Sequence, residues 1–303
     1  MPALSSIQEK VYRILCIVFI VPILAGCIQN PTGQPTGTPP LTSTLPPAPT
    51  PTLASTLTLI PSLTITPLAS PTESPLTIVF YGDSVLKVGD VSQQAAVGFS
   101  FVDPLRGMLP GKLHLLISNH GGRTAKWGYE NLEQNVLILQ PDLVTLWWGM
   151  NDLGGCPGIF DRDTNELVQY KLTALVNEHL HYLKALIDAM LEKDIPVFVM
   201  TPLPVLGDLP WSHFNADNEL VWENEYRCNF NLGLEQVIQA QRRLVAEYSA
   251  ENKPVFLVDA WQVYKDHPNS DKMYMDIVHP ASHGAELIAE AWLQVFQSIH
   301  IKR

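Results

Sequence analysis

Four short clusters along the chain carry the residue types that acyl transfer requires. They are Gly-Asp-Ser ending at Ser84, the glycine pair at 121–122, Gly-Met-Asn-Asp containing Asn151, and the closely spaced pair Asp276 and His279. A serine hydroxyl attacks a carbonyl carbon when a histidine takes its proton, and an acidic side chain orients that histidine. Glycine N–H groups and an asparagine amide can donate hydrogen bonds to the oxyanion that forms. Taken one at a time, such clusters are also common in turns and helix caps.

Strands predicted directly before three of these clusters give them a common location. Thr77–Tyr81 consists of β-branched and aromatic residues, the composition of a buried parallel strand, and Gly82 permits a tight turn before Ser84. Similar apolar runs, Leu113–Ser118 and Leu143–Trp148, precede the glycine pair and the asparagine cluster. Because open parallel sheets bind ligands at the carboxyl ends of their strands, we expect the clusters to meet at one edge.

The alternation of strands and helices predicts an α/β fold. Further strands are expected at Ile195–Met200 and Val255–Val258, and helices at Phe99–Leu109 (interrupted at Pro104), Trp127–Leu139, Glu166–Lys193, Leu232–Glu251 and Ala285–Ser298. The second of these helices is expected to present Leu132, Val136 and Leu139 on one face. Repeats of this kind build a parallel sheet covered on both faces, here a three-layer α/β/α sandwich with a five-stranded sheet in one domain, residues 76–303.

Together the clusters resemble the SGNH branch of the GDSL hydrolases, a family of serine esterases and lipases. The residues that match its four blocks are Ser84, Gly122, Asn151, and Asp276 with His279. Gly121 also fits the second block, and Val85 replaces the leucine that usually follows the serine. The resemblance extends from about Leu76 to the carboxyl terminus and implies a flavodoxin-like sandwich.

The resemblance also implies a role for each matching residue. Ser84 is expected to be the nucleophile, His279 the general base and Asp276 the group that orients the imidazole. The backbone N–H groups of Ser84 and Gly122, with the side-chain amide of Asn151, are expected to form the oxyanion hole. No cofactor is implied.

The amino terminus has the pattern of an export signal. Lys10 and Arg13 precede an apolar run, Ile14–Ala25, which is shorter than the ~20 residues of a membrane-spanning helix. The run ends in Leu24–Cys27, which resembles the lipobox of bacterial lipoproteins and implies that Cys27 is lipidated and becomes the first mature residue. An ordinary signal peptide and an uncleaved anchor are the alternatives, and each of the three places the protein outside the cytoplasm.

Residues 28–75 form the next predicted region, a linker. Proline and threonine dominate it, and Glu73 is its only charged residue. Such a segment cannot bury enough apolar surface to fold, so we expect it to be disordered and to hold the following domain away from the membrane. Whether its threonines carry sugar stays open.

Charge and motif content exclude several functions. The formal net charge of −11, without any basic run, argues against nucleic acid as a partner. No dinucleotide-binding glycine signature is present. His279 and His283 have a spacing that can bind a metal within a helix, but Pro280 places them at the start of one, and we expect no metal.

A long loop, Leu203–Phe230, is predicted to lie over the sheet edge. It contains Cys228, which in an exported protein is expected to form a disulfide with Cys156, although reactive or buried thiols are the alternatives. The loop is rich in aromatic and imidazole side chains: Trp211, His213, Phe214, Trp222 and Tyr226. Such a cluster can stack on sugar rings, hold acyl chains, or pack the loop onto the sheet.

The sequence therefore predicts a lipid-anchored extracytoplasmic serine esterase. Its expected substrates are O-acyl esters, above all O-acetyl groups on polysaccharide, with lipids and small esters as alternatives, and its expected attachment to the membrane is the lipid on Cys27. The alternative from another class is a carbohydrate- or lipid-binding protein that has kept the fold and lost turnover.

Overall fold

The computed structural model describes residues 75–86, 100–109, 113–214 and 220–299. The predicted signal segment with Cys27, and the predicted linker as far as residue 74, lie outside these ranges.

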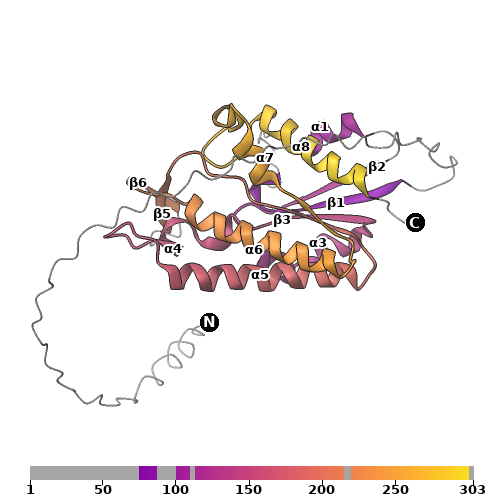
Figure 1. Ribbon diagram of the computed structural model, residues 1–303, viewed down its shortest axis with the longest axis horizontal. Coiled ribbons are helices and arrows are strands. Elements are labelled where there is room, and N and C mark those ends of the chain that lie inside the picture. The colour runs from indigo at the N-terminus through magenta and orange to yellow at the C-terminus, as the bar shows by residue number, and fades with distance from the viewer. Residues whose placement is uncertain (1–74, 87–99, 110–112, 215–219, 300–303) are drawn as a thin grey trace, which may run out of the picture. The chain divides into compact units, whose positions relative to one another are not determined.

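A parallel sheet forms the centre of the domain (Figure 1). Its strands are β1 Leu76–Gly82, β2 Leu113–Asn119, β3 Leu143–Trp147, β4 Val197–Met200 and β7 Val255–Val258. They lie in the order β2-β1-β3-β4-β7, and every neighbouring pair is parallel. From β1 the chain moves first to β2 on one side and then to β3, β4 and β7 on the other. The direction therefore reverses between β1 and β3, and sheets of this kind bind ligands at the carboxyl ends of the strands at that point. The predicted five-stranded parallel sheet is confirmed.

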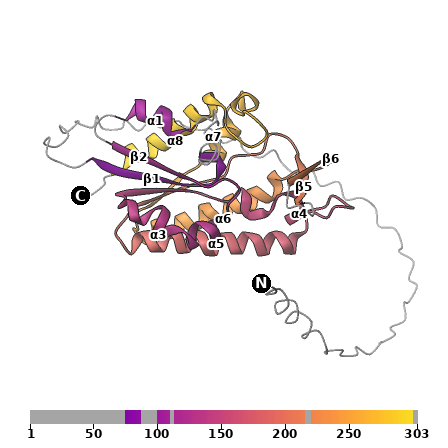
Figure 2. The ribbon, with the colours of Figure 1, turned by 180° about the vertical axis from the view of Figure 1, so that it is seen from behind.

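Helices cover both faces of the sheet, as Figures 1 and 2 show from opposite sides. One face carries α1 Val102–Met108, α7 Ala260–Asp266 and α8 Ser282–Ser298. The other carries α2 Ala125–Glu130, α3 Leu132–Asn135, α5 Gln169–Leu191 and α6 Asn231–Ala250. The short α4, Gly155–Ile159, and the 3-10 turns Ser84–Leu86, Leu137–Leu139, Asn151–Leu153 and Ser270–Met273 complete the helical elements of the described residues.

Burial on both faces explains the unbroken apolar composition of β1. Phe80 packs on one side against Trp292 of α8, with ring centroids 5.5 Å apart. Tyr81 packs on the other side against Trp148, at 5.1 Å. Alternate residues of a strand point to opposite faces, so a strand between two helical layers needs apolar side chains at every position.

Two details of the predicted helices are wrong. Residues 127–139 do not form one helix but α2, α3 and a 3-10 turn, because Asn131 leaves the helical conformation (φ −114°, ψ 13°) and caps α2, where both its N–H and its side-chain amide donate to Trp127 O. Leu139 is consequently exposed, although Leu132 is buried as expected. Pro104 does not interrupt α1 either, since it lies in the first turn, where no N–H is needed.

The predicted loop Leu203–Phe230 contains an antiparallel hairpin that the sequence did not reveal. Its strands are β5 Leu209–Phe214 and β6 Leu220–Cys228. The hairpin packs against α4 and forms a third buried cluster with residues of α5 and α6.

Candidate active site

Ser84 lies directly after β1, at the carboxyl end of the central strand. Gly82 ends that strand so close to β3 that a Cβ atom there would lie 2.4 Å from Trp147 O. The glycine is therefore required by this close approach, and it does not adopt a positive φ as a special turn would require. The Asp83 side chain accepts a 3.0 Å hydrogen bond from Val85 N–H and folds the chain into the 3-10 turn that begins at Ser84. Ser84 itself is half-buried.

Asp276 and His279 lie in the loop that leads into α8. Two backbone hydrogen bonds close this loop on itself, from Met275 N–H to His279 O at 2.9 Å and from Ala281 N–H to Met273 O at 2.7 Å. A short loop held in this way keeps the two side chains on the same turn.

The loop places His279 between Asp276 and Ser84. His279 Nε2 lies 3.0 Å from Ser84 Oγ, and His279 Nδ1 lies 2.7 Å from Asp276 Oδ2. Both are hydrogen-bond distances, and the contact to Ser84 joins residues 195 positions apart. The His279 side chain is 21% exposed and that of Asp276 is 47% exposed, so the pair opens to solvent and is accessible to a ligand.

Hydrogen bonds set the charge of Asp276. Desolvation by burial acts to raise the pKa of this carboxyl, but hydrogen bonds from Val278 N–H and from the side chain and N–H of His279 outweigh it and bring the pKa below its usual value. Asp276 therefore stays negative under conditions in which an imidazole is neutral, and it can stabilise a proton gained by His279.

The Asn151 amide lies between the other two clusters. Its Nδ2 donates to Asp83 Oδ2 at 3.1 Å and to Arg123 O at 3.1 Å. Asn151 also begins a 3-10 turn after β3, and this turn directs its side chain toward β1. The structure thus brings the Gly-Asp-Ser, Gly-Gly-Arg-Thr and Gly-Met-Asn-Asp clusters together.

Both glycines of the second cluster lie in the loop after β2. Gly122 has a φ of 69°, in the region that favours glycine. A Cβ at Gly121 would lie 3.6 Å from the Ser84 Cβ, so this glycine packs beside the serine. His120 N–H donates to Gly82 O at 2.9 Å and joins the loop to the end of β1.

Asp83 is a site residue that the sequence reasoning passed over. It is 2% exposed, and it holds Asn151 with one carboxylate oxygen and Val85 N–H with the other. Burial raises the pKa of Asp83 to about 7, and the nearby Asp152 carboxylate adds to the rise, while the hydrogen bonds from Val85 and Asn151 oppose it. Its position next to the expected nucleophile, in Gly-Asp-Ser, is the sequence feature that could have identified Asp83 as a site residue.

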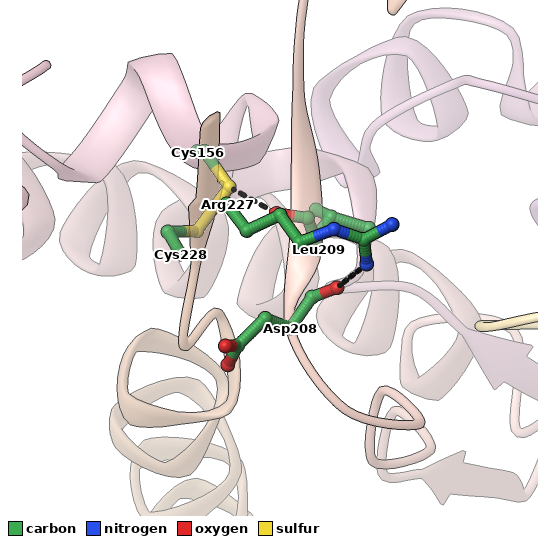
Figure 3. The surroundings of a disulfide bond; sticks show 5 residues. All are labelled: Cys156, Asp208, Leu209, Arg227 and Cys228. Atoms are coloured by element: carbon green, nitrogen blue, oxygen red, sulfur yellow. Dashed lines mark hydrogen bonds between the residues drawn. A yellow bond between two sulfur atoms is a disulfide. The ribbon is translucent and has the colours of Figure 1, made fainter. Parts of the chain in front are cut away.

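A disulfide fastens the hairpin beside this site (Figure 3). It joins Cys156 of α4 to Cys228 at the end of β6, with Cα atoms 5.9 Å apart. Arg227 donates a 3.0 Å hydrogen bond to Asp208 O at the base of the hairpin. Since α4 follows the turn that contains Asn151, the disulfide ties the hairpin to that turn.

The aromatic side chains of the hairpin have separate environments. Trp211 is 7% exposed and packs into the third buried cluster, whereas Tyr226 is 44% exposed and lies under the Arg162 guanidinium at 4.7 Å. The side chains of His213, Phe214 and Trp222 lie outside the described part of the structure.

The two histidines considered for a metal point to different partners. The His279 ring contacts Ser84 and Asp276, while His283, in the first turn of α8, is 76% exposed and lies 3.4 Å from Glu286. Within the described ranges, no three histidine, cysteine or acidic side chains gather as a metal site would require.

A membrane-crossing helix is also not found in the described ranges, where every helix is too short or too polar.

Comparisons with known proteins agree with this geometry. Residues 80–287 match the GDSL-like lipase/acylhydrolase family. No curated protein matches the chain in sequence. Among solved structures, a variant of Axe2, an acetyl-xylooligosaccharide esterase from Geobacillus stearothermophilus, is 19% identical with a TM-score of 0.51, over 76% of this chain and 97% of that one. A GDSL-like lipase candidate from Parabacteroides merdae is 17% identical with a TM-score of 0.53, over 74% and 97% of the two chains.

Identities this low support the shared fold alone, and the family match carries the assignment. It spans β1 to α8 and includes all four clusters. The chain belongs to the GDSL-like lipase/acylhydrolase family and is a carboxylic ester hydrolase of that family.

Proposed function

We propose that this chain is an extracytoplasmic, lipid-anchored serine esterase that removes O-acyl groups, chiefly O-acetyl groups, from polysaccharide. The observation that carries the proposed chemistry is the continuous series of contacts from Ser84 Oγ through the His279 ring to Asp276. Lipids and small esters are the alternative substrates.

In the first half of the proposed reaction, Ser84 Oγ attacks the ester carbonyl carbon and His279 Nε2 takes the hydroxyl proton. The tetrahedral intermediate then collapses, its bond to the alcohol oxygen breaks, and the alcohol leaves with the proton from His279. Asp276 keeps the His279 proton on Nδ1 and stabilises the imidazolium between the two proton transfers.

In the second half, water attacks the acyl-Ser84 ester. His279 takes a proton from the water and returns one to Ser84 Oγ as the carboxylic acid leaves. The atoms balance as ester plus water giving acid plus alcohol, and no cofactor is needed.

The proposed oxyanion hole consists of Ser84 N–H, Gly122 N–H and the amide of Asn151. In this structure Asn151 Nδ2 already donates to Asp83 and to Arg123 O. Asp83 fixes the orientation of the amide, and the developing oxyanion competes with Arg123 O for the other N–H. The hydrogen bond from Asn151 to the substrate oxygen is therefore made fully only as negative charge develops on that oxygen. Such a bond stabilises the transition state more than the bound substrate and so lowers the activation free energy of acyl transfer.

The proposed substrate class rests on access and on resemblance. Asp276 and His279 are open to solvent, which suits an ester on a bulky polymer. The structurally similar Axe2 acts on acetylated xylooligosaccharides. The proposed anchor at Cys27 and the linker that follows it suit a substrate in the cell envelope or beyond.

A chromogenic acetate ester assayed with the full-length chain tests the proposal. The Ser84→Ala variant is expected to lose hydrolysis to background, while Ser298→Ala, an exposed serine at the end of α8, is expected to match the wild type. Equal rates for wild type and Ser84→Ala would remove the serine mechanism. Acetate release from a panel of acetylated glycans, acylated lipids and small esters then identifies the substrate class.

A further inference from the structure

A second carboxylate–imidazole pair lies buried directly behind the Asn151 turn. Asp152 Oδ1 accepts a 3.0 Å hydrogen bond from Ala125 N–H, at the start of α2. The same oxygen lies 3.0 Å from Nδ1 of His179 on α5, although the two are not aligned as a full hydrogen bond. The side chain of Asp152 is 5% exposed and that of His179 is 0% exposed, so neither can contact a substrate.

Gln241 of α6 completes this network from the other side. Its Nε2 donates to Trp148 O at 2.9 Å and lies 2.9 Å from His179 Nε2. Because an amide nitrogen only donates, His179 Nε2 is the acceptor, and the ring carries its proton on Nδ1, facing Asp152. Gln241 also packs on Gly149, where a Cβ would lie 3.3 Å from its Nε2.

The network therefore holds the turn from Trp148 to Asp152 at both ends, between α5 and α6. Through Ala125 N–H, Asp152 also fixes the start of α2, which the loop with Gly122 enters. Asn151 touches the same loop through Arg123 O. The separation between the two loops that supply the proposed oxyanion donors is thus set by side chains that lie behind them.

We propose that Asp152, His179 and Gln241 are positioning residues. They hold the loop that carries Gly122 and the turn that carries Asn151 at the separation that oxyanion binding needs. This proposal rests on the proposed serine mechanism. Fold stability alone explains the network poorly, because two of its buried oxygens, Asp152 Oδ2 and Gln241 Oε1, have no hydrogen-bond partner among the described residues, and the contact between His179 Nδ1 and Asp152 Oδ1 is not well aligned.

The first experiment compares three single variants of the full-length chain in acetate-ester hydrolysis. His179→Leu is expected to lower kcat about 10- to 100-fold with KM changed less than about twofold, since a misplaced oxyanion donor affects the transition state most. His179→Asn keeps an N–H donor at the Nδ1 position and is expected to recover most of kcat. His181→Leu, an exposed histidine on the same helix, is the matched control and is expected to be unchanged.

A double-mutant cycle then separates positioning from general stability. If His179 acts through Asn151, the effect of His179→Leu shrinks to about threefold or less in an Asn151→Ala background, whereas a merely structural loss would multiply with it. Two results would overturn the proposal. One is an unchanged kcat in His179→Leu, and the other is an effect of His179→Leu on kcat that is as large in the Asn151→Ala background as in the wild type. If His179→Leu does not fold, Gln241→Met, which removes the donor to Trp148 O, is measured in the same cycle and decides the question.

Activity of Ser84→Ala distinguishes failure of the positioning role from failure of the serine mechanism. Loss of activity in Ser84→Ala with normal activity in both network variants rejects the positioning role and leaves the serine mechanism in place. Full activity in Ser84→Ala rejects the serine mechanism itself, whatever the network variants do.

Discussion

The carboxyl of Asp276 contacts the imidazole of His279, the proposed catalytic base. Its pKa lies below the usual value, so it stays ionised well below the pH at which an imidazole becomes neutral. The proposed mechanism requires an ionised Asp276 beside His279, and because the pKa of this carboxyl is lowered, mild acidification is expected to leave its charge, and its contribution to kcat/KM, in place.

The Asp276→Asn variant tests the role of this carboxyl. An amide at this position can hold the wrong imidazole tautomer, with the proton on Nε2, where it cannot accept the serine proton. We expect kcat to fall by roughly 10³- to 10⁴-fold with little change in KM. Steady-state kinetics beside a melting curve would check this, and a loss smaller than tenfold in a folded variant would contradict the proposed role.

Asp83 gives a prediction about stability and pH. Its pKa is about 7 in the folded state against an ordinary 3.8, so the folded state binds the proton more tightly than the unfolded state. The contribution of Asp83 is thus most favourable below about pH 4 and is lost as the pH rises to about 7. In Asp83→Asn this loss is absent, so the free energy of unfolding relative to wild type should rise by a few kcal/mol between pH 4 and pH 8.

Urea unfolding at several pH values measures this difference. A difference in the free energy of unfolding that is the same at every pH would come from the altered contact with Asn151. Only a difference that changes with pH reports protonation of the Asp83 carboxyl. A difference that does not vary with pH would show that Asp83 titrates normally.

At the scale of elements, the hairpin β5–β6 depends on a single covalent attachment to α4. The disulfide closes a segment with a sequence separation of 72, and removing a native disulfide of this kind commonly costs about 2–5 kcal/mol. The double variant Cys156→Ser, Cys228→Ser is expected to melt at a lower temperature. Its kcat/KM for bulky esters is expected to fall more than for a small acetate ester, because the hairpin stands beside the Asn151 turn.

A thermal melt and paired kinetics with the two esters check this prediction. The wild type treated with a reductant is the control that leaves the side chains unchanged. Equal losses for both esters would mean that the hairpin stabilises the domain without shaping access to Ser84.

The elements that could be predicted from the sequence are those whose composition follows directly from their surroundings. Strands such as Val255–Val258 lie between two helical layers, so their composition alone identifies them, and all five strands of the sheet were expected. The break at Asn131 and the β5–β6 hairpin depend on side-chain contacts that no periodicity encodes. The same holds for His179 and Gln241, which occupy ordinary positions in helical patterns and come together only when α5 packs on α6.

At the scale of the whole molecule, the proposed lipid anchor is expected to determine where the protein is found without changing its rate of ester hydrolysis. Cys27→Ser is expected to abolish incorporation of a labelled fatty acid in a bacterial host and to shift the protein from the membrane fraction. Hydrolysis of a soluble acetate ester is expected to be unchanged, since the described site lies wholly in residues after position 75. Fatty-acid label retained in Cys27→Ser would exclude the lipobox, and a changed kcat would show that the anchor influences the site.

The 195-residue separation between Ser84 and His279 has a consequence for biogenesis. Ser84 is synthesised long before His279, so a nascent chain that ends before His279 lacks the proposed catalytic base. Recovery of ester hydrolysis during refolding is therefore expected not to precede docking of the loop that carries His279 beside Ser84.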